Sequence, residues 1–114
     1  MHSHKQWNGM NKDFLNIMRK RSQEVMPKGT RVILFGSQAR GDSEPESDWD
    51  ILILMDKPQI QNADFDNYAY PLIELGWKNN EQVSPIMYTF RDWQKRRPTS
   101  FFHNVEKEGI ELCH

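Results

Sequence analysis

Hydrophobic and polar positions along this chain follow two different periods. The run 30–35 is apolar, rich in β-branched residues and bounded by glycines, which predicts a buried strand. The run 51–55 predicts a second strand, and 82–88 a third. A short edge strand is expected over 110–112.

Helical spacing of apolar residues separates these strands. A first helix, before residue 30, is marked by Phe14, Ile17 and Met18. A second, ending near Gly76, has one apolar face that consists of Phe65, Tyr68, Ala69, Leu72 and Ile73. Pro71 lies inside this second pattern and lacks a backbone donor, so we expect it to kink or split the helix.

Two short helices are expected near the C-terminus. Thr89 and Asp92 resemble a capping box at the start of a helix that Pro98 ends. Thr99 or Ser100 can cap a last helix. The order of elements predicts an α/β (α+β) fold.

Composition limits the class of protein. The 114 residues are enough for a single domain, 1–114, and the 37% hydrophobic and 27% charged residues are typical of a soluble protein. We expect no membrane segment, and the single Cys113 fits a cytoplasmic location. The net charge of −1 argues against binding long nucleic acid. His2 and His4 are read as terminal residues rather than as a metal site.

Candidate chemistry begins directly after the first strand. Gly36 permits a sharp turn and close approach of main chain to a ligand, and Ser37 can donate a hydroxyl group. Amides at the start of the helical turn 38–40 favour an anion, and Arg40 suits phosphate oxygens. Taken alone, such a segment is more often an ordinary connector with a solvated arginine.

Asp48 and Asp50 come directly before the second apolar run. On a strand both carboxylates leave the same face, whereas Trp49 points to the opposite face and into the core. Two such charges about 5 Å apart repel by roughly 1 kcal/mol in water and roughly 3 kcal/mol at a protein-like dielectric. A hard cation such as Mg²⁺ would remove that repulsion. Alone, the pair also fits a solvated acidic loop.

Together these residues resemble the signature of the DNA polymerase β-like nucleotidyltransferase superfamily. The string Gly36-Ser37-x-Ala39-Arg40-Gly41, followed by Ser47-Asp48-x-Asp50, is similar to the branch called minimal nucleotidyltransferases. The resemblance implies a mixed β-sheet of three to four strands with helices packed mainly on one face. It also implies transfer of a nucleoside monophosphate from a triphosphate to a hydroxyl group.

By the same resemblance, Gly36, Ser37 and Arg40 bind the nucleotide phosphates, and Asp48 and Asp50 are catalytic and hold two Mg²⁺ ions. The family usually adds a third carboxylate on a following strand. That position is occupied here by Ser84, with Glu81 nearby. Either Glu81 reaches in from the strand end, or the second metal is weakly held, or catalysis has been lost.

The leading hypothesis is a metal-dependent enzyme that transfers AMP from ATP, or another nucleoside triphosphate, to a protein or small molecule. The resemblance implies a small helical partner of the HEPN type, with this chain as the antitoxin of a toxin–antitoxin pair. Oligomerisation stays open. The alternative is a catalytically weak or inactive module that binds a nucleotide or a partner.

Overall fold

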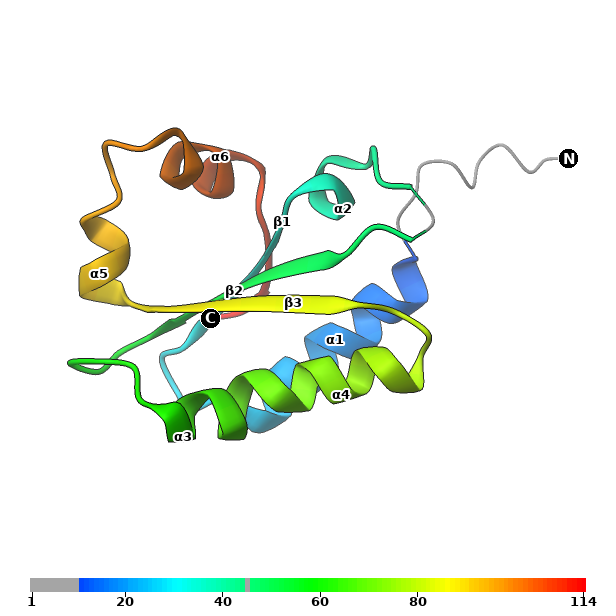
Figure 1. Ribbon diagram of the computed structural model, residues 1–114, viewed down its shortest axis with the longest axis horizontal. Helices are drawn as coiled ribbons and strands as arrows, with labels where there is room; N and C mark the ends of the chain where they lie inside the picture. The colour runs from blue at the N-terminus through cyan, green and yellow to red at the C-terminus, as the bar shows by residue number, and fades with distance from the viewer. Residues whose placement is uncertain (1–10, 45) are drawn as a thin grey trace, which may run out of the picture.

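The computed structural model describes residues 11–44 and 46–114, so the prediction for His2 and His4 lies outside the described residues. The strands are β1 (Arg31–Phe35), β2 (Trp49–Met55), β3 (Val83–Thr89) and β4 (Ile110–Cys113). They form one sheet in the order β3-β2-β1-β4 (Figure 1). Since β1 is antiparallel to β2 and β4 while β2 is parallel to β3, the predicted mixed sheet is confirmed.

The register gathers three strand ends at one end of the sheet. Phe35, the last residue of β1, pairs with Asp50 near the start of β2. Asp50 in turn pairs with Ser84 near the start of β3. The turn after β1 and the beginnings of β2 and β3 therefore meet.

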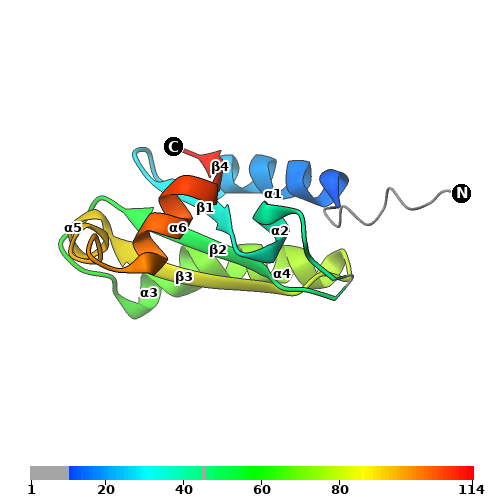
Figure 2. The same ribbon diagram turned by 90° about the horizontal axis from the view of Figure 1, so that it is seen from above.

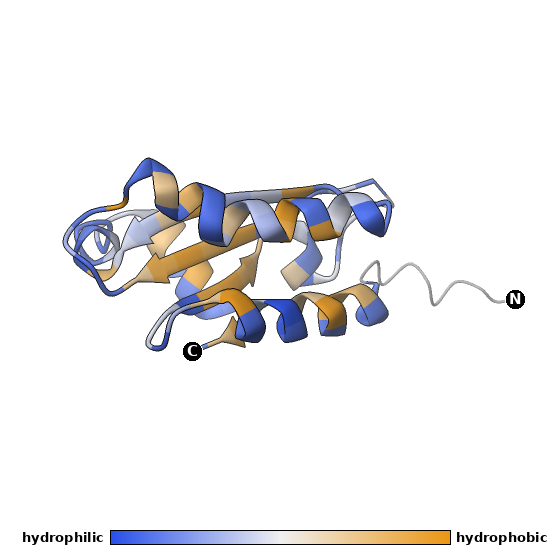
Figure 3. Ribbon diagram, turned by 90° about the horizontal axis from the view of Figure 1, so that it is seen from below, coloured by the Kyte–Doolittle hydropathy of each residue, from blue (hydrophilic) through white to orange (hydrophobic). Residues whose placement is uncertain are grey.

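Two long helical segments cover one face of the sheet (Figures 1 and 3). They are α1 (Lys12–Val25) and the continuous α3 (Asn62–Asp64), η2 (Phe65–Ala69) and α4 (Tyr70–Lys78). Beneath them lies the larger core cluster. Trp49 is fully buried in it and packs edge-on against Phe14, with ring centroids 4.9 Å apart. The predicted core position of Trp49 is confirmed.

Shorter helices cover part of the other face (Figure 2). They are α2 (Ser37–Arg40), α5 (Phe90–Gln94) and α6 (Ser100–Glu108). Leu52 and Leu54 are buried on this face with Trp93, whose Nε1 donates to Glu106 Oε2 at 2.7 Å. Asp50 lies on the same face, two residues before Leu52, and is half-buried.

Pro71 interrupts the second long helical segment as the sequence predicts. Residues 65–69 form a wider π-helical turn, and α4 then begins with Pro71 in its first turn. The helical hydrogen bonds continue through this turn up to Pro71, since the Tyr70 amide donates to the Phe65 carbonyl five residues earlier. The interruption therefore costs little helical hydrogen bonding.

The predicted helix starts at Thr89 and Thr99 are also confirmed. Thr89 Oγ1 accepts a hydrogen bond from the Asp92 amide at 3.0 Å, and Thr99 Oγ1 accepts one from the Phe102 amide at 3.1 Å. Thr99, and not Ser100, is the cap of α6. None of the helices within residues 11–44 and 46–114 combines the length and the hydropathy needed to cross a membrane.

Candidate active site

The backbone turns sharply after β1. Gly36 has φ 78° and ψ −157°, a conformation that residues with side chains rarely adopt. The single helical turn α2 follows, with the Arg40 amide donating to the Gly36 carbonyl at 3.1 Å. Amides at the start of such a turn have no partner inside it and point outward with partial positive charge. The turn therefore presents donors to an anion.

The acidic pair lies directly against this turn. A Cβ atom placed on Gly36 would lie 2.4 Å from Asp50 Oδ2, so the main chain and the carboxylate are in close contact. Asp48 lies two residues earlier in the chain, and its Oδ2 accepts a hydrogen bond at 2.9 Å from Ser84 on the neighbouring strand. The structure brings the predicted turn, both aspartates and Ser84 together.

The electrostatics of the pair disfavour two free negative charges. Burial raises the pKa of Asp50 above its ordinary range, and the charge of Asp48 raises it further, whereas Arg40 lowers it. Ionised Asp50 is therefore destabilised in the absence of a cation. A metal ion bound at the pair would remove this penalty.

Arg40 lies at the far end of the turn and contacts two carboxylates. Its Nε is 3.3 Å from Asp42 Oδ2, and a terminal nitrogen is 3.8 Å from Glu108 Oε1 on α6. Exposed pairs of this kind contribute about 0 to 1 kcal/mol, so a phosphate can replace them. A hollow of about 210 Å³ lies between Gly36, Arg40 and α6. The site has room for part of a nucleotide beside the turn.

Glu81 lies away from the acidic pair and binds other groups. Its Oε1 accepts a hydrogen bond from Trp49 Nε1 at 3.0 Å, and its Oε2 accepts one from Asn11 Nδ2 at 3.1 Å. Because Trp49 is buried on the face opposite Asp50, Glu81 joins the start of α1 to the core on that face. Ser84, and not Glu81, is next to the aspartates.

Gln38 has a structural role that the sequence did not reveal. This buried side chain donates from Nε2 to the Ser47 carbonyl at 3.1 Å and accepts at Oε1 from Ser43 Oγ at 3.1 Å. It thereby links the turn to the loop that leads into Asp48. A glutamine in a short helical turn normally faces solvent, so nothing in the sequence indicated that Gln38 would be buried.

The donor set fits Mg²⁺ accompanied by a nucleotide. In the part of the chain that the structure describes, no group of three or more histidine, cysteine, aspartate or glutamate side chains is arranged to hold a metal ion. Mg²⁺ usually takes one or two protein carboxylates and completes its shell with water and substrate phosphate. Asp48 and Asp50 match that need.

Comparison with known families agrees with this geometry. The family described as "Nucleotidyltransferase domain" matches residues 12–107, a span that includes the turn, both aspartates and Ser84. The chain belongs to the nucleotidyltransferase domain family. The resemblance carried by Gly36-Ser37 and the two aspartates is thus confirmed at the level of the family.

Two relatives of this nucleotidyltransferase domain come from Methanocaldococcus jannaschii. "Putative protein adenylyltransferase MJ0141" is 39% identical over 83 residues, which are 72% of this chain and 77% of that protein. "Putative protein adenylyltransferase MJ0604" is 35% identical over 101 residues, which are 89% of this chain and 92% of that protein. Both similarities extend over most of the domain.

A solved structure has the same fold. It is a chain from "Crystal structure of the toxin-antitoxin with AMP-PNP", with a TM-score of 0.56 and 22% sequence identity. The superposition covers 91% of this nucleotidyltransferase domain and 73% of that chain. This similarity supports the mixed sheet and its covering helices.

We predict that Gly36→Ala will remove stabilisation by Mg²⁺ and ATP, because the added Cβ must displace the Asp50 carboxylate. Gly29→Ala is a matched control, since Gly29 also has a positive φ, 89°, but nothing lies within 4 Å of its added Cβ. Both variants should lose about 1 to 2 kcal/mol of unfolding free energy through backbone strain. Thermal denaturation with and without Mg²⁺ and ATP measures the difference. An unchanged nucleotide response in Gly36→Ala would contradict the contact.

Glu81→Ala should destabilise the domain and leave nucleotide binding intact. It removes the acceptor of the buried Trp49 Nε1, which costs about 1 to 3 kcal/mol. Denaturant unfolding measures the loss, with the exposed neighbour Glu46→Ala as the control. Unchanged stability together with a weaker response to Mg²⁺ would instead place Glu81 at the metal.

Proposed function

We propose that this nucleotidyltransferase domain transfers AMP from ATP to a hydroxyl group of a protein or a small molecule in a Mg²⁺-dependent reaction. The contact between the Gly36 main chain and the Asp50 carboxylate is the observation that carries the proposal. It means that a triphosphate resting on the turn lies directly beside the acidic pair. The names of the two archaeal relatives, which refer to protein adenylyltransferases, support AMP as the transferred group.

Each residue near the turn has a distinct task in this proposal. Ser37 and the amides at the start of α2 bind the β- and γ-phosphates. Arg40 exchanges its exposed partners, Asp42 and Glu108, for phosphate oxygens. Asp48 and Asp50 hold Mg²⁺, which when bound neutralises phosphate charge and acidifies the attacking hydroxyl.

The reaction forms one bond and breaks one. The acceptor hydroxyl oxygen bonds to the α-phosphorus, and the bond from that phosphorus to the oxygen that bridges to the β-phosphate breaks. Pyrophosphate leaves, and the hydroxyl proton passes to solvent. The chain contributes chiefly by aligning the triphosphate between the turn and the aspartates.

A partner chain supplies the acceptor in this proposal. The described residues contain the turn and the acidic pair but place no separate acceptor domain beside them. A small helical HEPN-type toxin, with this domain as its antitoxin, is the partner we propose. The solved structure of similar fold is that of a toxin–antitoxin, which supports this choice.

Asp50→Asn should abolish transfer and stabilise the metal-free domain. Loss of the metal-binding charge should reduce label transfer from α-labelled ATP to the proposed HEPN-type partner at least about a hundredfold. Because the folded-state pKa of Asp50 is raised, its destabilising effect is absent at low pH and develops as pH rises through that pKa. Asparagine removes the penalty, so the metal-free variant should melt at a higher temperature than wild type at neutral pH.

Asp56→Asn provides the control for this experiment. Asp56 is exposed just after the opposite end of β2 and undergoes the same chemical change. Its label transfer should equal that of wild type. Full activity in Asp50→Asn, or equal loss in both variants, would contradict the proposed role of Asp50.

The presence of a serine at position 84 supports a second candidate function. In this alternative the domain binds a nucleotide or a partner but does not transfer AMP. A carboxylate is absent at this position, where Ser84 Oγ instead donates to Asp48. The two functions differ in whether label moves from ATP to the partner. Toxin neutralisation that survives both Asp48→Ala and Asp50→Ala would favour the binding module.

Ser84→Asp tests whether a third carboxylate limits catalysis. An added charge beside Asp48 should lower the Mg²⁺ concentration for half-maximal transfer by at least about fivefold, since charges about 4 Å apart interact by about 1 to 4 kcal/mol. Ser84→Asn, which adds a side chain of nearly the same volume as aspartate, serves as the control. An enzyme should show the shift in a Mg²⁺ titration of label transfer, whereas a module without activity should show no transfer in any variant.

A further inference from the structure

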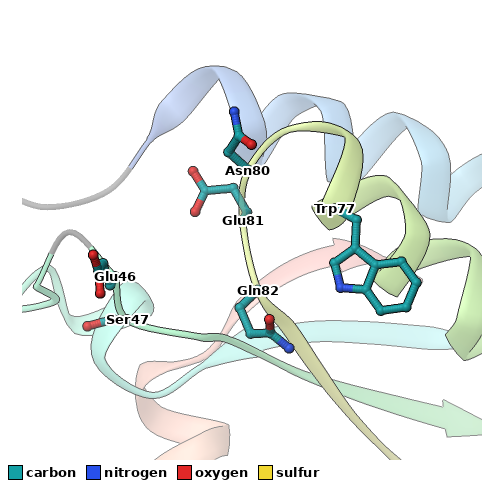
Figure 4. A pocket seen from close by; sticks show the side chains of 6 residues that line it. All are labelled: Glu46, Ser47, Trp77, Asn80, Glu81 and Gln82. Atoms are coloured by element: carbon teal, nitrogen blue, oxygen red, sulfur yellow. The ribbon is translucent and has the colours of Figure 1, made fainter.

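A surface groove lies at the end of the sheet where β2 and β3 begin. It has a volume of about 340 Å³ and is lined by Glu46, Ser47, Trp77, Asn80, Glu81 and Gln82. Figure 4 shows Glu46 and Ser47 on the loop before β2, Trp77 near the end of α4, and Gln82 between them. Three segments of the chain thus form one hollow.

The wall of this groove is fixed by the backbone. Asn80, at φ 59°, ends α4 in a Schellman motif, in which the Glu81 amide donates to the Gly76 carbonyl at 2.8 Å and the Asn80 amide to the Trp77 carbonyl at 3.3 Å. Gly76 packs so tightly that its Cβ would lie 2.7 Å from Val83 Cγ2. The groove is therefore preformed.

The lining of the groove adjoins Asp48 in the sequence. Ser47 directly precedes Asp48, and the Gln82 carbonyl accepts a hydrogen bond from the Trp49 amide at 2.8 Å. Neighbouring strands are about 4.8 Å apart and successive residues about 3.3 Å apart. A group that enters the groove along Gln82 can thus reach Asp48.

The strand order puts the groove and the turn on opposite sides of the pair. Asp50 on β2 has the Gly36 turn on its β1 side and the start of β3, with the groove, on its other side. In phosphoryl transfer the attacking and leaving oxygens lie roughly in line across the phosphorus. If pyrophosphate leaves toward the turn, the hydroxyl must arrive from the side of the groove.

The acidic and aromatic residues of the lining favour an acceptor that carries a positive charge close to its hydroxyl group. Glu46 is exposed, and the hydrogen-bond donors to Glu81 are the neutral side chains of Trp49 and Asn11. Among the described residues, neither glutamate takes part in an ion pair, and the lining contains no lysine or arginine. The indole of Trp77, 55% exposed, offers an aromatic face to a cation.

The size of the surface favours a polypeptide over a small molecule. The groove is open, and Trp77 continues it onto α4, where its ring meets the exposed Tyr70 edge-on with centroids 6.1 Å apart. A small molecule would cover part of this surface, whereas a chain segment would cover the groove and the aromatic side chains together. Aromatic residues of this kind are frequent anchors in protein interfaces.

We propose that the groove is the acceptor site, and that it receives a polypeptide segment with lysine or arginine beside the hydroxyl that takes AMP. This inference rests on the proposed function and adds the direction of approach and the charge of the acceptor. The hydroxyl oxygen attacks the α-phosphorus from the groove, pyrophosphate leaves on the side of the turn, and the proton goes to solvent.

Random copolymers test the proposal without knowledge of the natural acceptor. The full chain is incubated with Mg²⁺, α-labelled ATP and one of three polymers: lysine–tyrosine, lysine–serine or glutamate–tyrosine. At least one lysine copolymer should be labelled with a kcat/KM at least about tenfold above that of the glutamate copolymer, because basic segments complement the acidic lining. Kanamycin, a small polycation with hydroxyl groups, is run in parallel.

Two variants and two matched controls test whether the groove residues bind the lysine copolymer. Trp77→Ala and Glu46→Lys should each raise the KM for the lysine copolymer by about tenfold and leave the dissociation constant of Mg²⁺-ATP unchanged. Phe65→Ala alters an exposed aromatic side chain about 18 Å away along the same helical segment. Glu24→Lys makes the same charge reversal at an exposed position in the last turn of α1, away from the groove. Both controls should behave as wild type.

The outcomes separate this inference from the proposed function. Equal labelling of acidic and basic copolymers, preferential labelling of kanamycin, or equal KM values in the variants and controls would overturn the groove proposal. Stabilisation by Mg²⁺-ATP without labelling of either lysine copolymer would overturn it too, with the nucleotide site retained. Absence of both nucleotide binding and labelling would mean that the proposed function itself fails.

Discussion

The close contact between the Gly36 main chain and the Asp50 carboxylate is the constraint on which the candidate site depends. Antiparallel pairing of β1 with β2 puts the end of one strand beside the start of the other, and glycine leaves room for the carboxylate. A shift of the pairing by one residue would turn Asp50 to the opposite face, where Trp49 is buried. The register of the sheet therefore determines whether the turn and the acidic pair can act together.

The surrounding core holds this electrostatically unfavourable arrangement in place. Trp49 on one face and Leu52 on the other are fully buried immediately beside Asp50, so β2 is anchored from both sides. Gln38 fixes the loop before Asp48, and Glu81 fixes the start of β3 through Trp49 and Asn11. Burial of apolar neighbours thus offsets the repulsion between the aspartates, which a bound cation would relieve.

The sequence predicted most of this fold because local patterns determine it. Strand alternation put Trp49 in the core, Pro71 marked the helix interruption, and Thr99 marked a cap. The contact of Ser84 with Asp48 agrees with its expected strand position. The partners of Gln38 and Glu81, and the groove beside Trp77, could not be predicted, because they depend on contacts between segments that are far apart in the sequence or on the exact path of loops. Such contacts leave no periodic signal.

A crystal structure of the full chain with Mg²⁺ and a non-hydrolysable ATP analogue would show whether the turn and the acidic pair bind the triphosphate and the metal together. We expect Mg²⁺ bound to Asp48 and Asp50, with the β- and γ-phosphates against Ser37 and the amides that follow Gly36. A nucleotide bound elsewhere with the aspartates free of metal would contradict this expectation.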